Sequence, residues 1–86
     1  MIDMEKLSAG LEKLRGLDLE ECEAAERAAG NNFPELSFTK SFQARLAAKA
    51  LDMNPFDLKE LSLKEYDSAC RGVFNFLFAS SASETP

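Results

Sequence analysis

The sequence contains no histidine, no CxxC motif and no run of 18 apolar residues. Without histidine, the chain lacks the most common general base and metal ligand of proteins. Its two cysteines, Cys22 and Cys70, stand 48 positions apart, so neither a disulfide framework nor a zinc site is expected. The missing apolar run argues against a membrane span, and the N-terminal residues MIDMEKLSAG contain no secretory signal. These absences indicate a cytoplasmic protein with two reduced thiols.

Catalytic motifs are also missing. The chain has no Gly-rich phosphate loop, no nucleophile elbow and no paired-carboxylate motif. The neighbours of Cys22 are acidic, which raises the pKa of a thiol and disfavours a nucleophile. The acidic run between Asp18 and Glu26 lacks the spacing of an EF-hand loop and is interpreted as a solvated helix face. The sequence therefore predicts a protein that is not an enzyme and that needs no metal or cofactor.

The net negative charge of the chain argues against nucleic-acid binding. Its 86 residues include 15 acidic and 10 basic side chains, giving a net charge of −5 and a pI near 4.6. A protein with this balance repels phosphate backbones on average, and electrostatics supplies most non-specific nucleic-acid affinity. An apolar fraction of 45% with 29% charged residues is that of an ordinary globular domain.

Helix signals repeat along the chain, and no segment alternates apolar and polar residues as a half-buried strand does. Apolar residues at positions 4, 7, 11 and 14 predict a first helix that ends at Gly16. Gly10 weakens this helix by about 1 kcal/mol relative to alanine. Asp18, with Glu21 three positions later, predicts the N-cap of a second helix that continues to Ala29.

Three further helices are predicted after a connection at residues 33–36. Their expected N-caps are Ser37 or Thr39, Asn54 and Ser62. The buried face of the first of them is expected to hold Phe38, Phe42, Leu46 and Ala50. The predicted fold class is all-α, a compact bundle of four to five short helices in a single domain at residues 1–79. Residues 1–16 either join the bundle or stay mobile, and residues 80–86, SSASETP, are expected to form a disordered tail.

The segment Leu63–Phe78 carries more apolar side chains than one buried helix face can use. Spacings of three and four place Leu63, Tyr66, Cys70, Val73 and Leu77 on one face, which is expected to pack in the core. Core packing is also favoured for Phe74, whereas core and partner surface are equally consistent with Phe76 and Phe78. The heptad-like first helix offers a second surface. The candidate partner-binding residues are Phe74, Phe76, Phe78, Leu7, Leu11 and Leu14.

The order of these motifs resembles that of the small tail assembly chaperones of long-tailed phages and prophages. The matching pieces lie within Leu17–Phe78 and are LDLEECEAAERAAG, FQARLAAKAL, NPFDLKELSLKEY and FNFLF. The resemblance implies a non-enzymatic protein of the host cytoplasm that binds the tape-measure protein and helps bring tail-tube subunits to it. It places the helical core on Leu19, Leu46, Ala47, Ala48, Leu58, Leu61, Tyr66, Phe76 and Leu77. Residues 1–16 depart from the pattern, because many family members begin with a segment that resembles a β-hairpin.

Two alternatives stay open at this point. ARLAAKALDMNPFDLKEL has the layout of a helix-turn-helix with its turn at Asp52, as in a small DNA-binding prophage regulator. Its second helix would present Asp57 and Glu60, and no arginine, to DNA, so this function ranks second. An adaptor unrelated to phages ranks third. The first helix allows either a monomer or a self-associating protein, since two heptads are short for a coiled coil.

Overall fold

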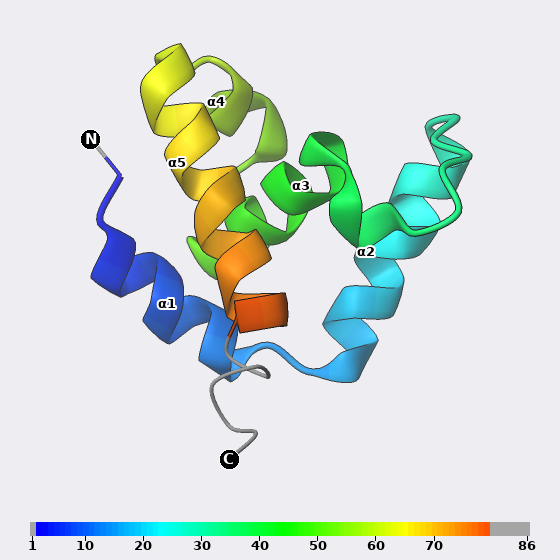
Figure 1. Ribbon diagram of the computed structural model, residues 1–86, viewed down its shortest axis with the longest axis horizontal. Helices are drawn as coiled ribbons and strands as arrows, with labels where there is room; N and C mark the ends of the chain where they lie inside the picture. The colour runs from blue at the N-terminus through cyan, green and yellow to red at the C-terminus, as the bar shows by residue number, and fades with distance from the viewer. Residues whose placement is uncertain (1, 80–86) are drawn as a thin grey trace.

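The structure, a computed structural model, describes residues 2–79, and every regular element in that range is a helix (Figure 1). The α-helices are α1 (Met4–Lys13), α2 (Gly16–Ala28), α3 (Lys40–Ala50), α4 (Pro55–Lys59) and α5 (Leu63–Phe74). A 3-10 turn, η1 (Leu36–Phe38), precedes α3, and a π-helical turn, η2 (Asn75–Ala79), continues α5. The predicted all-α bundle of short helices is confirmed. The tail expected at residues 80–86 lies outside the described residues.

Helix α3 is the centre of the bundle. It contacts α1, α2, α4, α5 and η1, and in Figure 1 it lies between α5 and α2. Its sequence explains this position, because alanines on several sides of the helix let neighbours approach closely. The buried residues of α3 are Phe42, Gln43, Ala44, Leu46, Ala47 and Ala48. The core therefore forms around α3, and the other helices cover it.

Helix α1 is packed into this core. Leu7 and Leu11 are buried, and α1 contacts both α3 and α5. The structure thus corrects the expectation that Leu7 and Leu11 face a partner, because both side chains are enclosed by this chain's own helices. Leu14, which follows the end of α1, is only partly buried against the core. Of the three leucines proposed for a partner, only Leu14 keeps an accessible side chain.

Helix α2 begins earlier than expected. Gly16, predicted to end the first helix, is the first residue of α2, and Asp18 occupies the third position of that helix instead of its N-cap. The carboxylate of Asp18 accepts a hydrogen bond from the backbone N–H of Arg15 at 2.8 Å. An acidic side chain in this position satisfies an N–H group that has no partner within the helix.

The other predicted caps are confirmed. Thr39, Asn54 and Ser62 each precede a helix, and their side chains accept backbone N–H bonds from Phe42, Phe56 and Glu65. Helices α2 and α3 both end in a Schellman motif, in which backbone N–H groups after the helix bond carbonyls of its last turn. The left-handed residue of this motif is Gly30 after α2, with φ 100°, and Asp52 after α3, with φ 56°.

The buried face of α5 starts later than the sequence pattern suggests. Its buried residues are Ala69, Cys70 and Val73, all in the second half of the helix. Leu63, predicted to lie on this face, is 84% exposed. It is the first residue of α5, and Figure 1 shows that the first turn of α5 lies at the edge of the molecule, past the core. The assignment of Leu63 to the core is therefore wrong.

Candidate functional site

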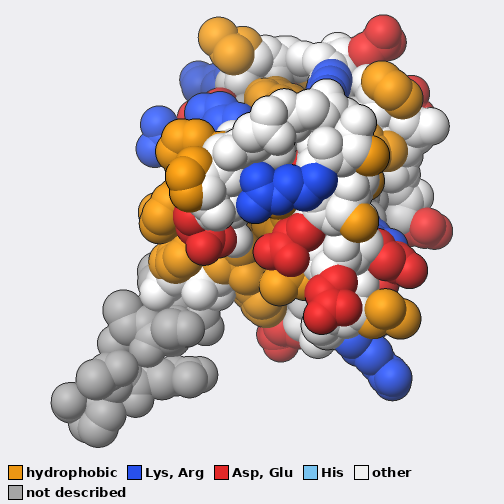
Figure 2. Space-filling model, turned by 90° about the vertical axis from the view of Figure 1, so that its right-hand side faces the viewer, with side chains coloured by type: hydrophobic (Ala, Val, Ile, Leu, Met, Phe, Trp, Pro, Cys, Tyr) orange, Lys and Arg blue, Asp and Glu red, His pale blue; other side chains and the backbone are white. Residues whose placement is uncertain are grey.

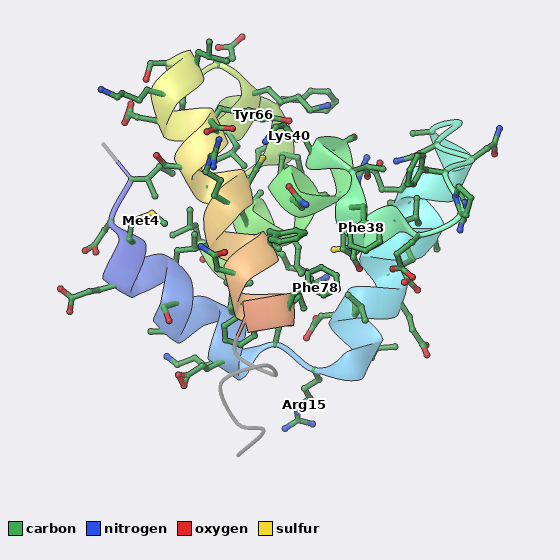
Figure 3. The ribbon with its side chains drawn as sticks, in the orientation of Figure 1. Met4, Arg15, Phe38, Lys40, Tyr66 and Phe78 are labelled. Atoms are coloured by element: carbon green, nitrogen blue, oxygen red, sulfur yellow. The ribbon has the colours of Figure 1, made fainter. Side chains whose placement is uncertain are left out.

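Three phenylalanine rings form a surface cluster where α5 continues into η2. This Phe cluster consists of Phe38, Phe74 and Phe78. The ring centroids of Phe38 and Phe78 are 5.2 Å apart, those of Phe74 and Phe78 4.8 Å, and those of Phe38 and Phe74 6.2 Å. Figure 3 shows Phe38 and Phe78 side by side. Rings at these separations attract one another beyond the effect of burial. Even so, Phe38 is 55% and Phe74 38% exposed, so the cluster offers a fixed aromatic surface to solvent.

The position of Phe38 is set by the anchoring of η1 on α3. Leu36, two residues before it, is buried in the core. The buried side chain of Gln43 donates a hydrogen bond from Nε2 to the carbonyl of Ser37 at 2.8 Å. Because the core and Gln43 fix the two residues that precede Phe38, the Phe38 ring lies on the outer side of the turn.

The sequence assigned Phe38 to the buried face of the helix that follows it. Phe42 and Leu46 are buried as expected, but Phe38 lies before the N-cap residue Thr39 and does not belong to α3. A signal for this was present, since a cap at Thr39 leaves Phe38 outside the helix. The sequence offered Ser37 as an equal alternative, and only the fold selects Thr39.

An apolar cleft of about 180 Å³ lies beside η2, where the chain turns from α1 into α2. It is lined by Leu11, Leu14, Arg15, Gly16, Leu19, Leu46, Phe76 and Leu77. Phe76 and Leu77 are partly buried and pack against the core. The cleft therefore brings together three predicted partner residues, the buried Leu11 and the partly buried Leu14 and Phe76, from distant parts of the sequence. The other two accessible candidates, Phe74 and Phe78, lie in the Phe cluster instead.

A hollow with two cations borders the Phe cluster. This basic hollow, of about 430 Å³, is lined by Phe38, Lys40, Gln43, Arg71, Phe74 and Asn75. Lys40 Nζ lies 2.9 Å from Asp67 Oδ1, and Arg71 Nε lies 2.6 Å from Asp67 Oδ2. The hydrogen bonds from Lys40 and Arg71 hold the pKa of the Asp67 carboxyl below its usual value. The Asp67 carboxylate thus pairs with two cations at the edge of the Phe cluster.

Glu26 corrects the interpretation of the acidic run as a solvated face. Its side chain is 1% exposed and lies between α2 and α3. Arg45 Nε, Ser41 Oγ and Asn31 Nδ2 donate hydrogen bonds to its carboxylate at 2.7, 3.1 and 2.9 Å. Burial acts to raise the pKa of Glu26, but these hydrogen bonds outweigh it and the pKa is lowered. Glu26 is a structural link between two helices, with its hydrogen-bonding capacity used inside the fold.

The two cysteines are buried thiols. Burial raises the pKa of both Cys22 and Cys70, and for Cys22 this outweighs the nearby cations Lys49 and Arg45. Such thiols hold their protons and disfavour the thiolate form that reacts or binds metals. Among residues 2–79, no group of three or more cysteine, aspartate or glutamate side chains is placed to hold a metal ion.

The segment that resembles a helix-turn-helix is α3, the turn at Asp52, and α4. Helix α4 has only five residues. Its outer surface carries Phe56, which is 73% exposed, and Lys59, whose Nζ lies 5.9 Å from the centre of the Phe56 ring. Asp57 and Glu60 are exposed beside them. This short helix presents an aromatic ring and mixed charges, whereas phosphate contacts need a row of cations.

Within residues 2–79, none of the helices has the length and apolar character needed to cross a membrane. Comparisons of the chain with protein families, with curated proteins and with solved structures each find no match.

Proposed function

We propose that this chain is a non-enzymatic binding protein that acts as a tail assembly chaperone of a phage or prophage in the host cytoplasm. The observation that carries the proposal is the Phe cluster, in which rings that could be buried are held together on the surface. Contiguous exposed apolar surface of this kind marks sites of protein interaction. The client is the tape-measure protein, whose hydrophobic helices need a soluble partner before the tail-tube protein surrounds them.

The size of the surface suits reversible binding. Full burial of a phenylalanine side chain stabilises a complex by about 1.5–3 kcal/mol. Phe38 and Phe74 are roughly half exposed, so burying the rest of both rings contributes about 1.5–3 kcal/mol, less than association costs. A client must therefore also use the apolar cleft beside η2. A weak, extended contact allows release when the tail assembles, and the net charge of −5 helps to keep the complex in solution.

The test first asks whether an adjacent reading frame encodes a very long helical protein, and then produces that protein with and without this chain in the same bacterial cells. We expect the chain to raise the soluble fraction of that client. Phe38→Ser and Phe78→Ser should each weaken binding about tenfold, since each removes an aromatic contact at the interface. Phe56→Ser is the control, because Phe56 is a still more exposed phenylalanine, at 73%, that lies on α4 away from the Phe cluster.

Equal client solubility in the presence and absence of the chain would contradict the proposal, as would an equal effect of Phe56→Ser. Salt-sensitive binding of duplex DNA at micromolar or lower concentration would instead support the prophage regulator.

A further inference from the structure

The basic hollow beside the Phe cluster combines apolar surface with a local excess of positive charge on an acidic protein. We infer that it binds an amphipathic helix whose apolar stripe is bordered by acidic side chains. This inference rests on the proposed function, because it names the chemistry of the client segment that the Phe cluster accepts.

The apolar part of the contact is made by the aromatic wall of the hollow. Phe38 and Phe74 line it from two elements, η1 and α5, and both rings remain partly exposed. A large apolar side chain that enters the hollow covers both rings at once. Helices commonly bind in this way, with anchors spaced three or four residues apart along one face.

The polar part of the contact comes from cations that have unused donors. Within residues 2–79, Arg71 donates one hydrogen bond, from Nε, and Lys40 donates one from Nζ, both to Asp67. A guanidinium carries five N–H donors and an ammonium three, so most of them are open to a partner. The side chains of Lys40 and Arg71 are 57% and 74% exposed. Two positive charges facing one negative charge leave a surplus that a client carboxylate can neutralise.

Two cations of α3 differ from those of the hollow, because their charge is already paired with acidic side chains of α2. Arg45 pairs with the buried Glu26, and Lys49 lies 2.6 Å from Glu21 and 3.5 Å from Asp18. Figure 2, which views the molecule from the side of α2, shows acidic and basic side chains interspersed on that face. A helix with acidic borders is attracted to the surplus positive charge of the hollow, whereas a helix with basic borders is not. Local charge thus selects the kind of helix that binds in the hollow.

The test compares two synthetic peptides of about 20 residues, long enough to form helix on binding. They share one leucine stripe, bordered by glutamates in one peptide and by lysines in the other. Binding to the intact chain is measured by fluorescence anisotropy at 0.15 M salt, where charges more than about 8 Å apart are largely screened. We expect the glutamate peptide to bind about three- to tenfold more tightly, as two partly exposed ion pairs would give.

Charge reversal in the hollow provides the decisive variant. Arg71→Glu and, independently, Lys40→Glu should remove or reverse the preference for the glutamate peptide. Lys64→Glu is the matched control, because Lys64 is an exposed cation in the first turn of the same helix as Arg71. Circular dichroism verifies that each variant is folded.

Equal or tighter binding of the lysine peptide to the unmodified chain would overturn the inference, and so would an unchanged preference in Arg71→Glu and Lys40→Glu. If both peptides bind equally and Phe78→Ser weakens both, the charge preference fails while the proposed function stands. If neither peptide binds, the proposed apolar site fails as well. A dimer in sedimentation velocity that Phe78→Ser dissociates would make a second copy of the chain the occupant, against the inference.

Discussion

Gly10 of α1 lies directly against the backbone of Ala50 at the end of α3. A Cβ atom on residue 10 would come within 2.8 Å of the Ala50 carbonyl carbon and 3.1 Å of its Cβ. Only glycine permits this approach, which brings Leu7 and Leu11 into the core. The residue that weakens α1 as an isolated helix is therefore the residue that lets α1 join the bundle.

Gly10→Ala should destabilise the protein by about 1–3 kcal/mol. The clash with rigid backbone exceeds the gain of about 1 kcal/mol in helix propensity. Urea unfolding followed by circular dichroism measures the effect. Gly16→Ala is the control, because no atom lies within 4 Å of a Cβ built there, and it should change stability by less than about 0.5 kcal/mol. An unchanged urea midpoint in Gly10→Ala would show that α1 does not depend on this contact.

Phe76 and Phe78 should respond differently to the same substitution. Phe76 packs against the core, so Phe76→Ser is expected to lower the free energy of unfolding by about 2–4 kcal/mol. Phe78 contacts the other rings of the exposed Phe cluster, so Phe78→Ser should lower it by only about 1 kcal/mol. Thermal denaturation of both variants decides the point. A larger loss for Phe78→Ser than for Phe76→Ser would place Phe78 in the core and remove it from the partner surface.

Glu26 should give the fold an acid-sensitive component. Its pKa is lowered in the folded state, so the unfolded chain binds this proton more readily. The stabilisation by the Glu26 carboxylate is therefore complete above the ordinary carboxyl pKa. It is lost as the pH falls through the pKa that Glu26 has in the folded protein. Glu26→Gln should cost about 1.5–3 kcal/mol at neutral pH, because charge-assisted hydrogen bonds are weakened.

The difference in stability between the unmodified chain and Glu26→Gln should shrink as the pH is lowered from about 6 to 3. The same change at the exposed Glu20 is the control and should have little effect at neutral pH. A difference that stays constant with pH would mean that the carboxylate charge of Glu26 is not what holds α2 to α3.

Replacing Asp52 with glycine should stabilise the folded protein. It occupies the left-handed position after α3 with φ 56°, where a side chain with a Cβ costs about 1–2 kcal/mol. Asp52→Gly should raise the free energy of unfolding by up to about 1 kcal/mol. The converse substitution, Gly30→Ala, places a Cβ at the same position after α2, where φ is 100°, and should destabilise the protein. Both effects are read from urea midpoints, and a lower midpoint for Asp52→Gly or a higher one for Gly30→Ala would contradict the assignment of the two Schellman motifs.

The helices were largely predictable because their signals are local. Thr39, Asn54 and Ser62 cap helices through hydrogen bonds to residues two or three positions away, which a sequence pattern can express. Gly16 and Asp18 were misplaced by the same logic. A glycine can end one helix or begin the next, and an acidic residue can act at the N-cap or in the first turn.

The candidate site was only partly predictable. The surplus of phenylalanine after Val73 was visible in the sequence, but core packing was favoured for Phe74, which is 38% exposed and packs against the half-buried Phe78. The third ring, Phe38, was assigned to the core, because its exposure depends on how η1 is held by Gln43. No local sequence pattern predicts the basic hollow, because Lys40 and Arg71 both reach Asp67 only in the folded chain.

The sequence by itself determined the all-α class, most helix limits and the apolar surplus at the end of α5, since periodicity and capping act over a few residues. The tertiary structure decided which apolar helix faces are buried in the core and which remain exposed. Leu7 and Leu11 became core because Gly10 lets α1 approach α3, and Glu26 became buried because Arg45, Ser41 and Asn31 meet it there. These outcomes depend on contacts between distant segments, whose geometry no local pattern of residues can specify.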